Sequence, residues 1–146
     1  IANCAKAGLG VVLVPTLVPG VNTHNIGEIL HFALSCTPAV KGVHFQPVSY
    51  FGRYPETPDN DARLSLPELM RAIETQSQGL FKAEHFNPPG CENSLCSMHA
   101  NYLLLNADKL LSLNHPNCCS DPADALTGSA KAVKHTAKNG TAAITL

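Results

Sequence analysis

The stretch of this sequence that decides its fold is Gly42-Val43-His44-Phe45-Gln46-Pro47-Val48-Ser49-Tyr50-Phe51-Gly52-Arg53-Tyr54-Pro55. It begins as an apolar run typical of a buried strand, and at Gln46 it changes into a polar, aromatic loop that contains glycine, proline and one arginine. In α/β proteins, ligand-binding groups follow their strands in this way, because clefts open beyond the carboxyl ends of parallel strands. The stretch therefore predicts a strand that leads into a ligand-binding loop.

A second unit of the same kind lies just upstream. The apolar run from Val11 to Val18 is followed by the turn Pro19-Gly20-Val21-Asn22 and then by a helix with one apolar face. The residues of that face recur at helical spacing, and they are Ile26, Ile29, Leu30, Ala33 and Leu34. Thr37-Pro38 ends the helix, and the run from Val40 to Val48 forms the next strand. This order predicts a β–α–β unit of parallel strands, in which Pro15 indicates an edge position or a bulge.

The rest of the chain predicts shorter elements. Ser65-Leu66-Pro67-Glu68 has capping-box spacing and begins a helix that runs to about Gln76. Two apolar runs within residues 102–113 indicate a β-hairpin. Asp121-Pro122 begins a further predicted helix, and residues 141–146 form a short strand or a free tail.

Composition limits the classes of function. The 146 residues suffice for one domain with a core, and 45% of them are hydrophobic while only 14% are charged. A surface so poor in charge predicts that a partner, or chain absent from this sequence, covers part of it. The net charge of −1 includes no basic block, which argues against nucleic acid as a partner. No apolar run reaches the roughly 18–20 residues that a membrane span needs and no signal peptide is recognisable, so we expect no membrane partner and a cytoplasmic protein.

The first residues suggest that sequence is missing in front of them. Residues 1–8 have the pattern of the last turns of a helix, with Ile1, Cys4 and Ala5 as its apolar positions and Gly8 as its end. A domain rarely begins inside a helix. We therefore expect this chain to be a fragment of a longer protein.

Two segments carry a family resemblance. The first is Val14-Pro15-Thr16-Leu17-Val18-Pro19-Gly20-Val21-Asn22, followed by Ile26-Gly27-Glu28-Ile29, and the second is Val43-His44-Phe45-Gln46-Pro47-Val48. They resemble the fifth strand with its turn, the fifth helix and the sixth strand of the barrel in the radical S-adenosylmethionine (radical SAM) superfamily. The resemblance implies an α/β fold, with about half of a TIM-type barrel over residues 1–90. A cysteine-containing extension over residues 91–146, with a hairpin and a helix, would follow it.

The resemblance also implies an activity for the whole protein. Radical SAM enzymes bind S-adenosylmethionine (SAM) and a [4Fe–4S] cluster, but their C-x3-C-x2-C cluster motif does not occur in this sequence. We therefore expect the cluster in a missing N-terminal half of the same protein, and no activity from this chain alone. The expected contacts to SAM or to the substrate, which would be a small molecule or a peptide, come from Thr16, Val18, Asn22, Phe45, Gln46, Pro47, Val48 and Arg53.

Several of these residues also have a purely structural interpretation, which the sequence leaves open. Val18 and Phe45 fit a hydrophobic core, and Asn22 fits the cap of the helix that follows it. The guanidinium of Arg53 can bind a carboxylate in bidentate fashion, or it can stack on one of two nearby tyrosines.

Four of the six cysteines lie in polar, turn-rich surroundings, and they are Cys91, Cys96, Cys118 and Cys119. Pro89-Gly90-Cys91-Glu92, with Ser94, Cys96 and His99, is similar to a segment that follows the barrel in some radical SAM enzymes. Thiolates are soft ligands that suit iron, so these cysteines predict an auxiliary iron–sulfur cluster. A zinc site that includes His99, and free thiols without a metal, are the two other interpretations.

A second class of function stays open. The same features describe a non-enzymatic α/β binding or assembly module, with a zinc or partner site in the cysteine region. An incomplete barrel would also expose strand edges and apolar faces, which predicts self-association. The sequence contains no Ser–His–Asp set, phosphate-binding glycine loop or H-E-x-x-H motif that would indicate another chemistry.

Overall fold

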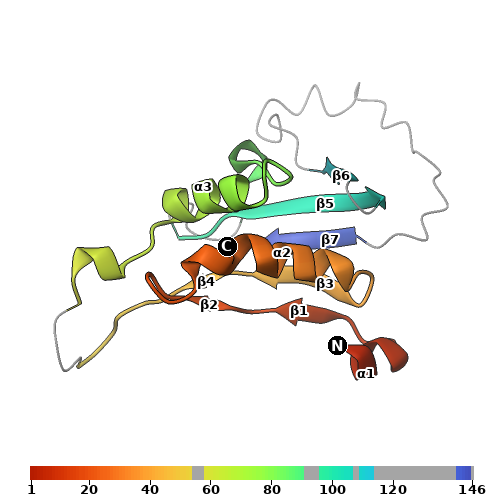
Figure 1. Ribbon diagram of the computed structural model, residues 1–146, viewed down its shortest axis with the longest axis horizontal. Helices are drawn as coiled ribbons and strands as arrows, with labels where there is room; N and C mark the ends of the chain where they lie inside the picture. The colour runs from red at the N-terminus through yellow and green to blue at the C-terminus, as the bar shows by residue number, and fades with distance from the viewer. Residues whose placement is uncertain (54–57, 91–95, 107–108, 114–140, 146) are drawn as a thin grey trace.

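A computed structural model describes residues 1–53, 58–90, 96–106, 109–113 and 141–145 of the chain (Figure 1). Within them, one five-stranded sheet has the order β1-β3-β7-β5-β6, and a two-stranded sheet pairs β2 with β4. The strands are β1 (Val11–Leu13), β2 (Thr16–Leu17), β3 (Val40–His44), β4 (Gln46–Pro47), β5 (His99–Asn106), β6 (Lys109–Ser112) and β7 (Thr141–Thr145). The helices are α1 (Ala2–Lys6), α2 (Ile26–Ser35) and α3 (Leu66–Gln76), with 3-10 turns η1 (Thr23–Asn25), η2 (Asn60–Ala62) and η3 (Ala83–His85).

The predicted β–α–β unit is confirmed. β1 and β3 are parallel, with Leu13 opposite Val43, and α2 connects them along the chain. β2 and β4 extend this pair beyond a break, with Thr16 opposite Gln46. Pro15 lies in the break, where its carbonyl accepts a hydrogen bond from the Gln46 N–H at 3.0 Å. Because β1 is the terminal strand in the described sheet, the edge position that Pro15 indicated is confirmed as well.

The later strands complete the same sheet. β5 and β6 form the predicted antiparallel hairpin, and β5 begins earlier than expected, at His99. β7 lies between them and the β–α–β unit, parallel to β3 and antiparallel to β5. Strands from both sides of the boundary predicted at residue 90 therefore share one sheet. The helix predicted from Asp121 lies outside the described residues.

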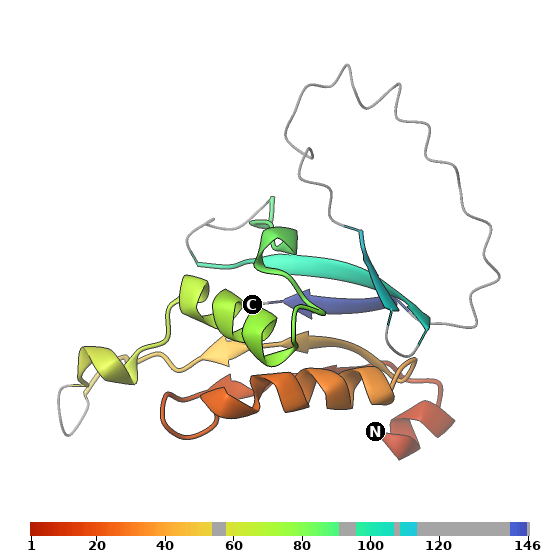
Figure 2. The same cartoon turned by 45° about the horizontal axis from the view of Figure 1, so that its top comes forward.

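The described strands form an open sheet, not a closed barrel. α2 and α3 both lie on one side of it (Figures 1 and 2). The buried core between this side and the helices consists of Leu17, Ile26, Leu30, Ala33, Val40, Val43, Phe45, Leu69, Ile73, Phe81, Phe86, Ala100 and Tyr102. Half of a TIM-type barrel stays a prediction, because an open sheet with helices on one side is compatible with it without requiring it.

The other side of the sheet, which we call the uncovered face, carries exposed apolar side chains. Successive side chains of a strand point to opposite faces, so Val12, Val14 and Thr16 share the side that Leu17 does not. Leu17 is fully buried, whereas Val12 and Val14 are 56% and 55% exposed. Leu111 of β6 is 50% exposed and adds to the same face. Apolar side chains in this position leave a surface that a further layer of protein or a ligand can cover.

α3 begins where the sequence predicts. The Glu68 carboxylate accepts from the Ser65 N–H at 2.8 Å and the Ser65 side chain accepts from the Glu68 backbone N–H, which together form the capping box; the Ser65 hydroxyl also donates to the carboxylate at 2.6 Å. The hydrogen bonds that the carboxylate accepts lower the pKa of Glu68. No helix in the described part of the chain has the length and apolar character that crossing a membrane requires.

Candidate functional site

The side-chain amide of Asn22 holds the turn that follows β2. Its Oδ1 accepts a hydrogen bond from the Val18 N–H at 2.8 Å, and its Nδ2 donates to the Thr16 carbonyl at 2.8 Å. The backbone N–H groups of Val21 and Asn22 donate to the Val18 carbonyl at 3.0 and 3.2 Å. Gly20 has a φ of 75°, a conformation that glycine adopts at little cost. The turn is thereby closed onto the carboxyl end of β2.

Of the two interpretations of Asn22, the side-chain cap of the following helix is wrong. Asn22 precedes η1, and Asn25 occupies the cap position of α2, but neither side chain makes a capping hydrogen bond. Both polar ends of the Asn22 amide are already bonded within the turn. Asn22 therefore shapes the loop and does not start the helix.

Replacing Asn22 by alanine should lower the free energy of unfolding by about 1–2 kcal/mol, because two hydrogen bonds are lost from a partly buried turn. Chemical denaturation measures the change. Asn60→Ala is the matched control, because it removes the same side chain from an exposed position. Equal stability of Asn22→Ala and the wild-type protein would show that the amide does not hold the turn.

Four predicted contact residues lie together at the carboxyl ends of the paired strands. Thr16 and Gln46 are directly opposite each other, and both are exposed. Val18 and Val48 directly follow β2 and β4, and both are half-buried. By the alternation of side chains these four share the uncovered face. The structure thus brings together side chains from the two strands that sequence reasoning selected separately.

Phe45 does not belong to this group. Its side chain is fully buried in the core, on the face covered by α2 and α3. Of its two interpretations, the structural one describes the side chain, because a ring without exposed surface cannot contact a ligand. Only its backbone remains available for the predicted role.

The backbone of β4 has one occupied edge. The N–H groups of Gln46 and Val48 donate to the carbonyls of Pro15 and Leu17 at 3.0 and 2.8 Å. Within the described residues, β2 is the one strand that pairs with β4, so no described strand lies along the opposite edge. Pro47 supplies a carbonyl there but no N–H. This edge suits a ligand with hydrogen-bond donors, such as the amino group of a heterocycle.

Arg53 is exposed. The arginine that stacks over the ring of Tyr50 is Arg63. The guanidinium of Arg63 lies 5.8 Å from the ring centroid of Tyr50. The Tyr50 hydroxyl donates to the carbonyl of Ala62 at 3.1 Å, which holds the ring against this part of the loop. Sequence reasoning missed Arg63, because nothing in the local pattern brings a residue thirteen positions away back over the tyrosine.

The predicted metal site falls mostly outside the described residues. Three of its four cysteines are outside the described residues, and they are Cys91, Cys118 and Cys119. The fourth, Cys96, has a free and exposed thiol. Among the residues that are described, no three histidine, cysteine, aspartate or glutamate side chains gather as metal ligands would. The auxiliary cluster and the zinc site therefore stay predictions.

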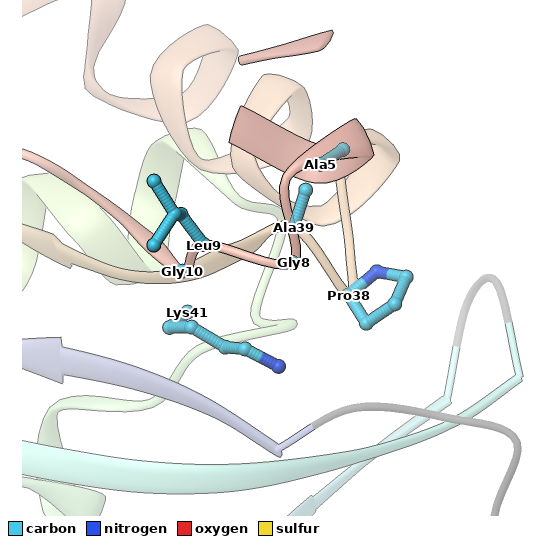
Figure 3. Close-up of a pocket in the computed structure, with 7 residues that line it drawn as sticks. All are labelled: Ala5, Gly8, Leu9, Gly10, Pro38, Ala39 and Lys41. Atoms are coloured by element: carbon cyan, nitrogen blue, oxygen red, sulfur yellow. The ribbon is translucent and has the colours of Figure 1, made fainter. Parts of the chain in front are cut away.

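One cavity of about 260 Å³ lies at the amino ends of β1 and β3 (Figure 3). Its lining consists of Ala5, Gly8, Leu9, Gly10, Pro38, Ala39 and Lys41. Lys41 is its one charged side chain, and its stem crosses Gly10 so closely that a Cβ there would lie 2.9 Å from the lysine Cγ. This end of the sheet is opposite to the end at which parallel α/β sheets bind ligands.

A more open groove of about 440 Å³ lies at the carboxyl ends, beside the turn that Asn22 holds. Its lining consists of Pro19, Thr23, His24, Asp61, Arg63, Leu64, Glu68, Ala72 and Gln76. The groove therefore joins the loop after β2, the loop after β4 and one face of α3. Of the two cavities, this one lies at the end of the sheet where parallel α/β sheets bind ligands, but on the side that the helices cover.

The comparison with known proteins leads to the radical SAM enzymes, the class that the sequence resembles. One relative is the 7,8-dihydro-6-hydroxymethylpterin dimethyltransferase of Methanocaldococcus jannaschii, to which the chain is 42% identical over 89 residues. The matched part is 60% of this chain but 18% of the relative's length. No family model matches the chain.

Proposed function

We propose that this chain is part of a cytoplasmic radical SAM enzyme of the methyltransferase type, in which it supplies contacts to SAM and to the substrate. The observation that carries the proposal is the position of Thr16 and Gln46. They are paired on the uncovered face at the carboxyl ends of β2 and β4, and the residues around them belong to the segments that resemble the family. The similarity to a pterin dimethyltransferase supports the class of reaction.

The described residues fit SAM better than they fit a cluster. An adenine ring is flat and apolar on its faces, so it suits the surface around Val14 and Thr16, and its amino group suits the open edge of β4. A [4Fe–4S] cluster is held by several thiolates, and of the four cysteines predicted to bind one, the described residues include Cys96 alone. We therefore place the catalytic cluster in another part of the whole protein. When bound there, the cluster supplies the electron that cleaves SAM.

This chain's own residues would bind and orient. Thr16 and Val18 contact one face of the adenine, and Gln46 reads polar groups of the substrate at the mouth of the site. Arg53 is exposed in the loop after β4, where its guanidinium can bind a carboxylate of SAM or of the substrate. The pterin in the relative's name makes a small heterocyclic molecule the substrate class that we propose.

The uncovered face and the free edge of β1 require a cover. We propose that other strands of the barrel, from the N-terminal part of the whole protein, pair with β1 and enclose the face around Val12 and Val14. Without them, the same edge and face can pair with a second copy of the chain. Sedimentation of the isolated 146-residue chain should then show concentration-dependent association, and a strict monomer would contradict this part of the proposal.

The test of the function is SAM binding and cleavage by the whole natural protein, reconstituted anaerobically with iron and sulfide. The wild-type protein should bind SAM and cleave it under a strong reductant. Thr16→Glu should weaken SAM binding about tenfold or more, because it places an uncompensated charge against a desolvated ring. Thr75→Glu makes the same change at an exposed position of α3 and should leave binding unchanged.

The two possible failures have different meanings. A wild-type protein that neither binds nor cleaves SAM would refute the proposed class of enzyme. A wild-type protein that binds SAM, together with a Thr16→Glu variant that binds it equally well, would refute the placement of SAM on the uncovered face.

A further inference from the structure

The end of α3 is tied to the beginning of α2 by one side chain, that of Gln76. Its Nε2 donates to the Thr23 carbonyl at 2.8 Å, and its Oε1 accepts from the Gly27 N–H at 3.1 Å. The partners lie 53 and 49 residues away in the sequence. Gln76 is half-buried, and it also lines the groove of about 440 Å³ beside the turn.

The Gln76 amide replaces a missing helix cap. The first N–H groups of a helix have no partner within it, and a side chain just before the helix usually accepts from one of them. Asn25, at the cap position of α2, does not do so. The Oε1 of Gln76 accepts from Gly27 instead, so α3 caps α2 from a distance.

α2 and α3 approach each other so closely at Gly27 that there is no room for a side chain there. A Cβ added to Gly27 would lie 2.5 Å from the backbone oxygen of Gln76 and 3.0 Å from its Cβ. The backbone of α2 therefore rests directly on the last turn of α3. Gln76 is fixed by this contact, and its amide holds Thr23 at a defined distance from α3.

Thr23 follows directly on Asn22, whose amide fixes the Thr16 carbonyl and the Val18 N–H. Two side-chain amides thus hold the turn, Asn22 from the side of β2 and Gln76 from the side of α3. We infer that Gln76 is a positioning residue for SAM binding, because its amide sets where the Pro19–Asn22 turn stands relative to Thr16 and Val18. This inference rests on the proposed function and assigns to it a residue that does not touch the uncovered face.

The decisive variant is Gln76→Glu, which keeps the shape and the acceptor but loses the donor. At neutral pH the carboxylate still accepts from Gly27 and repels the Thr23 carbonyl, so the turn shifts while the helix cap remains. SAM binding by the whole protein should weaken about tenfold, and the melting temperature should fall less than in Gln76→Met, because one of the two hydrogen bonds is kept. Gln78→Glu makes the same change at an exposed position and should bind SAM normally.

Two further readouts separate positioning from a general loss of structure. Lowering the pH protonates the new carboxyl group, which can then donate to Thr23, so SAM affinity of Gln76→Glu should recover relative to wild type. In the ligand-free Gln76→Glu variant, hydrogen exchange at the Val18 N–H should be faster than in the wild-type protein, while exchange at the Gly27 N–H should stay slow. Gln76→Met loses the hydrogen bonds to Thr23 and to Gly27, so exchange should become faster at the N–H groups of both Val18 and Gly27.

The outcomes are distinguishable. If the wild-type protein does not bind SAM, the proposed function fails, while hydrogen exchange still tests the Gln76 contact. If the wild-type protein binds SAM and Gln76→Glu binds it equally well, or if exchange at Val18 does not change, the positioning role is refuted. Weak binding that does not recover at low pH also refutes it, because the lost donor would then not be the cause.

Discussion

Phe45→Ala should lower the free energy of unfolding by about 3–5 kcal/mol, which is the range for truncating a fully buried phenylalanine. The ring has no exposed surface and packs in the core with Leu17 and Val43. The loss combines the transfer free energy of the ring with the cost of the cavity that it leaves. A domain of ordinary stability has only about 5–15 kcal/mol, so a large share of it would disappear. Equilibrium denaturation of the chain measures the change.

Phe51→Ala is the matched control for Phe45→Ala. It removes the same ring six positions further along, where the side chain is 82% exposed, and the stability should change by less than about 0.5 kcal/mol. If the Phe45 variant were as stable as this control but had lost SAM binding, the ring would be a ligand contact and its place in the core would be wrong.

Gly27→Ala has the second-largest expected effect, and two opposing terms decide its sign. Alanine in a helix is favoured over glycine by about 1 kcal/mol. Against this, the new Cβ would meet the backbone oxygen of Gln76 at 2.5 Å, and a backbone atom at the end of α3 cannot rotate away. Overpacking costs about 1–3 kcal/mol, and separation of the helices also breaks the hydrogen bond from Gly27 to Gln76, worth about 1 kcal/mol. We expect a net loss of about 2 kcal/mol in chemical denaturation.

Two glycines provide graded controls for Gly27→Ala. A Cβ at Gly10 would meet the flexible stem of Lys41, which can move aside, so Gly10→Ala should cost little. A Cβ at Gly90 would meet nothing within 4 Å, so Gly90→Ala should be neutral. If Gly27→Ala proved as stable as these two variants, the contact between the helices would be looser than the geometry indicates.

Local patterns were sufficient for most of the elements. The apolar spacing of α2, the capping box at Ser65 and the paired apolar runs of the hairpin each depend on residues close together in the sequence, and all three elements are present. The place of β7 could not be predicted in this way. It pairs Ala143 with Gly42, and the short alternating pattern of residues 141–145 does not specify which strands will accept it.

In the candidate site too, some features follow from local sequence patterns and others depend on contacts between distant residues. The position of Thr16 and Gln46 at the carboxyl ends of two strands could be predicted, because it needs only the parallel pairing of two neighbouring strands. The roles of Asn22, Arg63 and Gln76 depend on the distances that their side chains span in the folded chain. Asn22 was interpreted as a helix cap from its position alone, and the amide instead reaches back to β2. Arg63 and Gln76 have no local signal at all.

The strand order has a consequence for the way in which this protein folds. β7 is the middle strand of the described sheet, yet it follows β1, β3, β5 and β6 along the chain and is synthesised after all four. Until it has been made, β1 with β3 and the hairpin of β5 with β6 have no strand between them, and closing so long a stretch of chain is slow. During that interval the inner edges of β3 and β5 are open to pairing with other chains. Yield during synthesis should therefore fall when the capacity of chaperones is lowered.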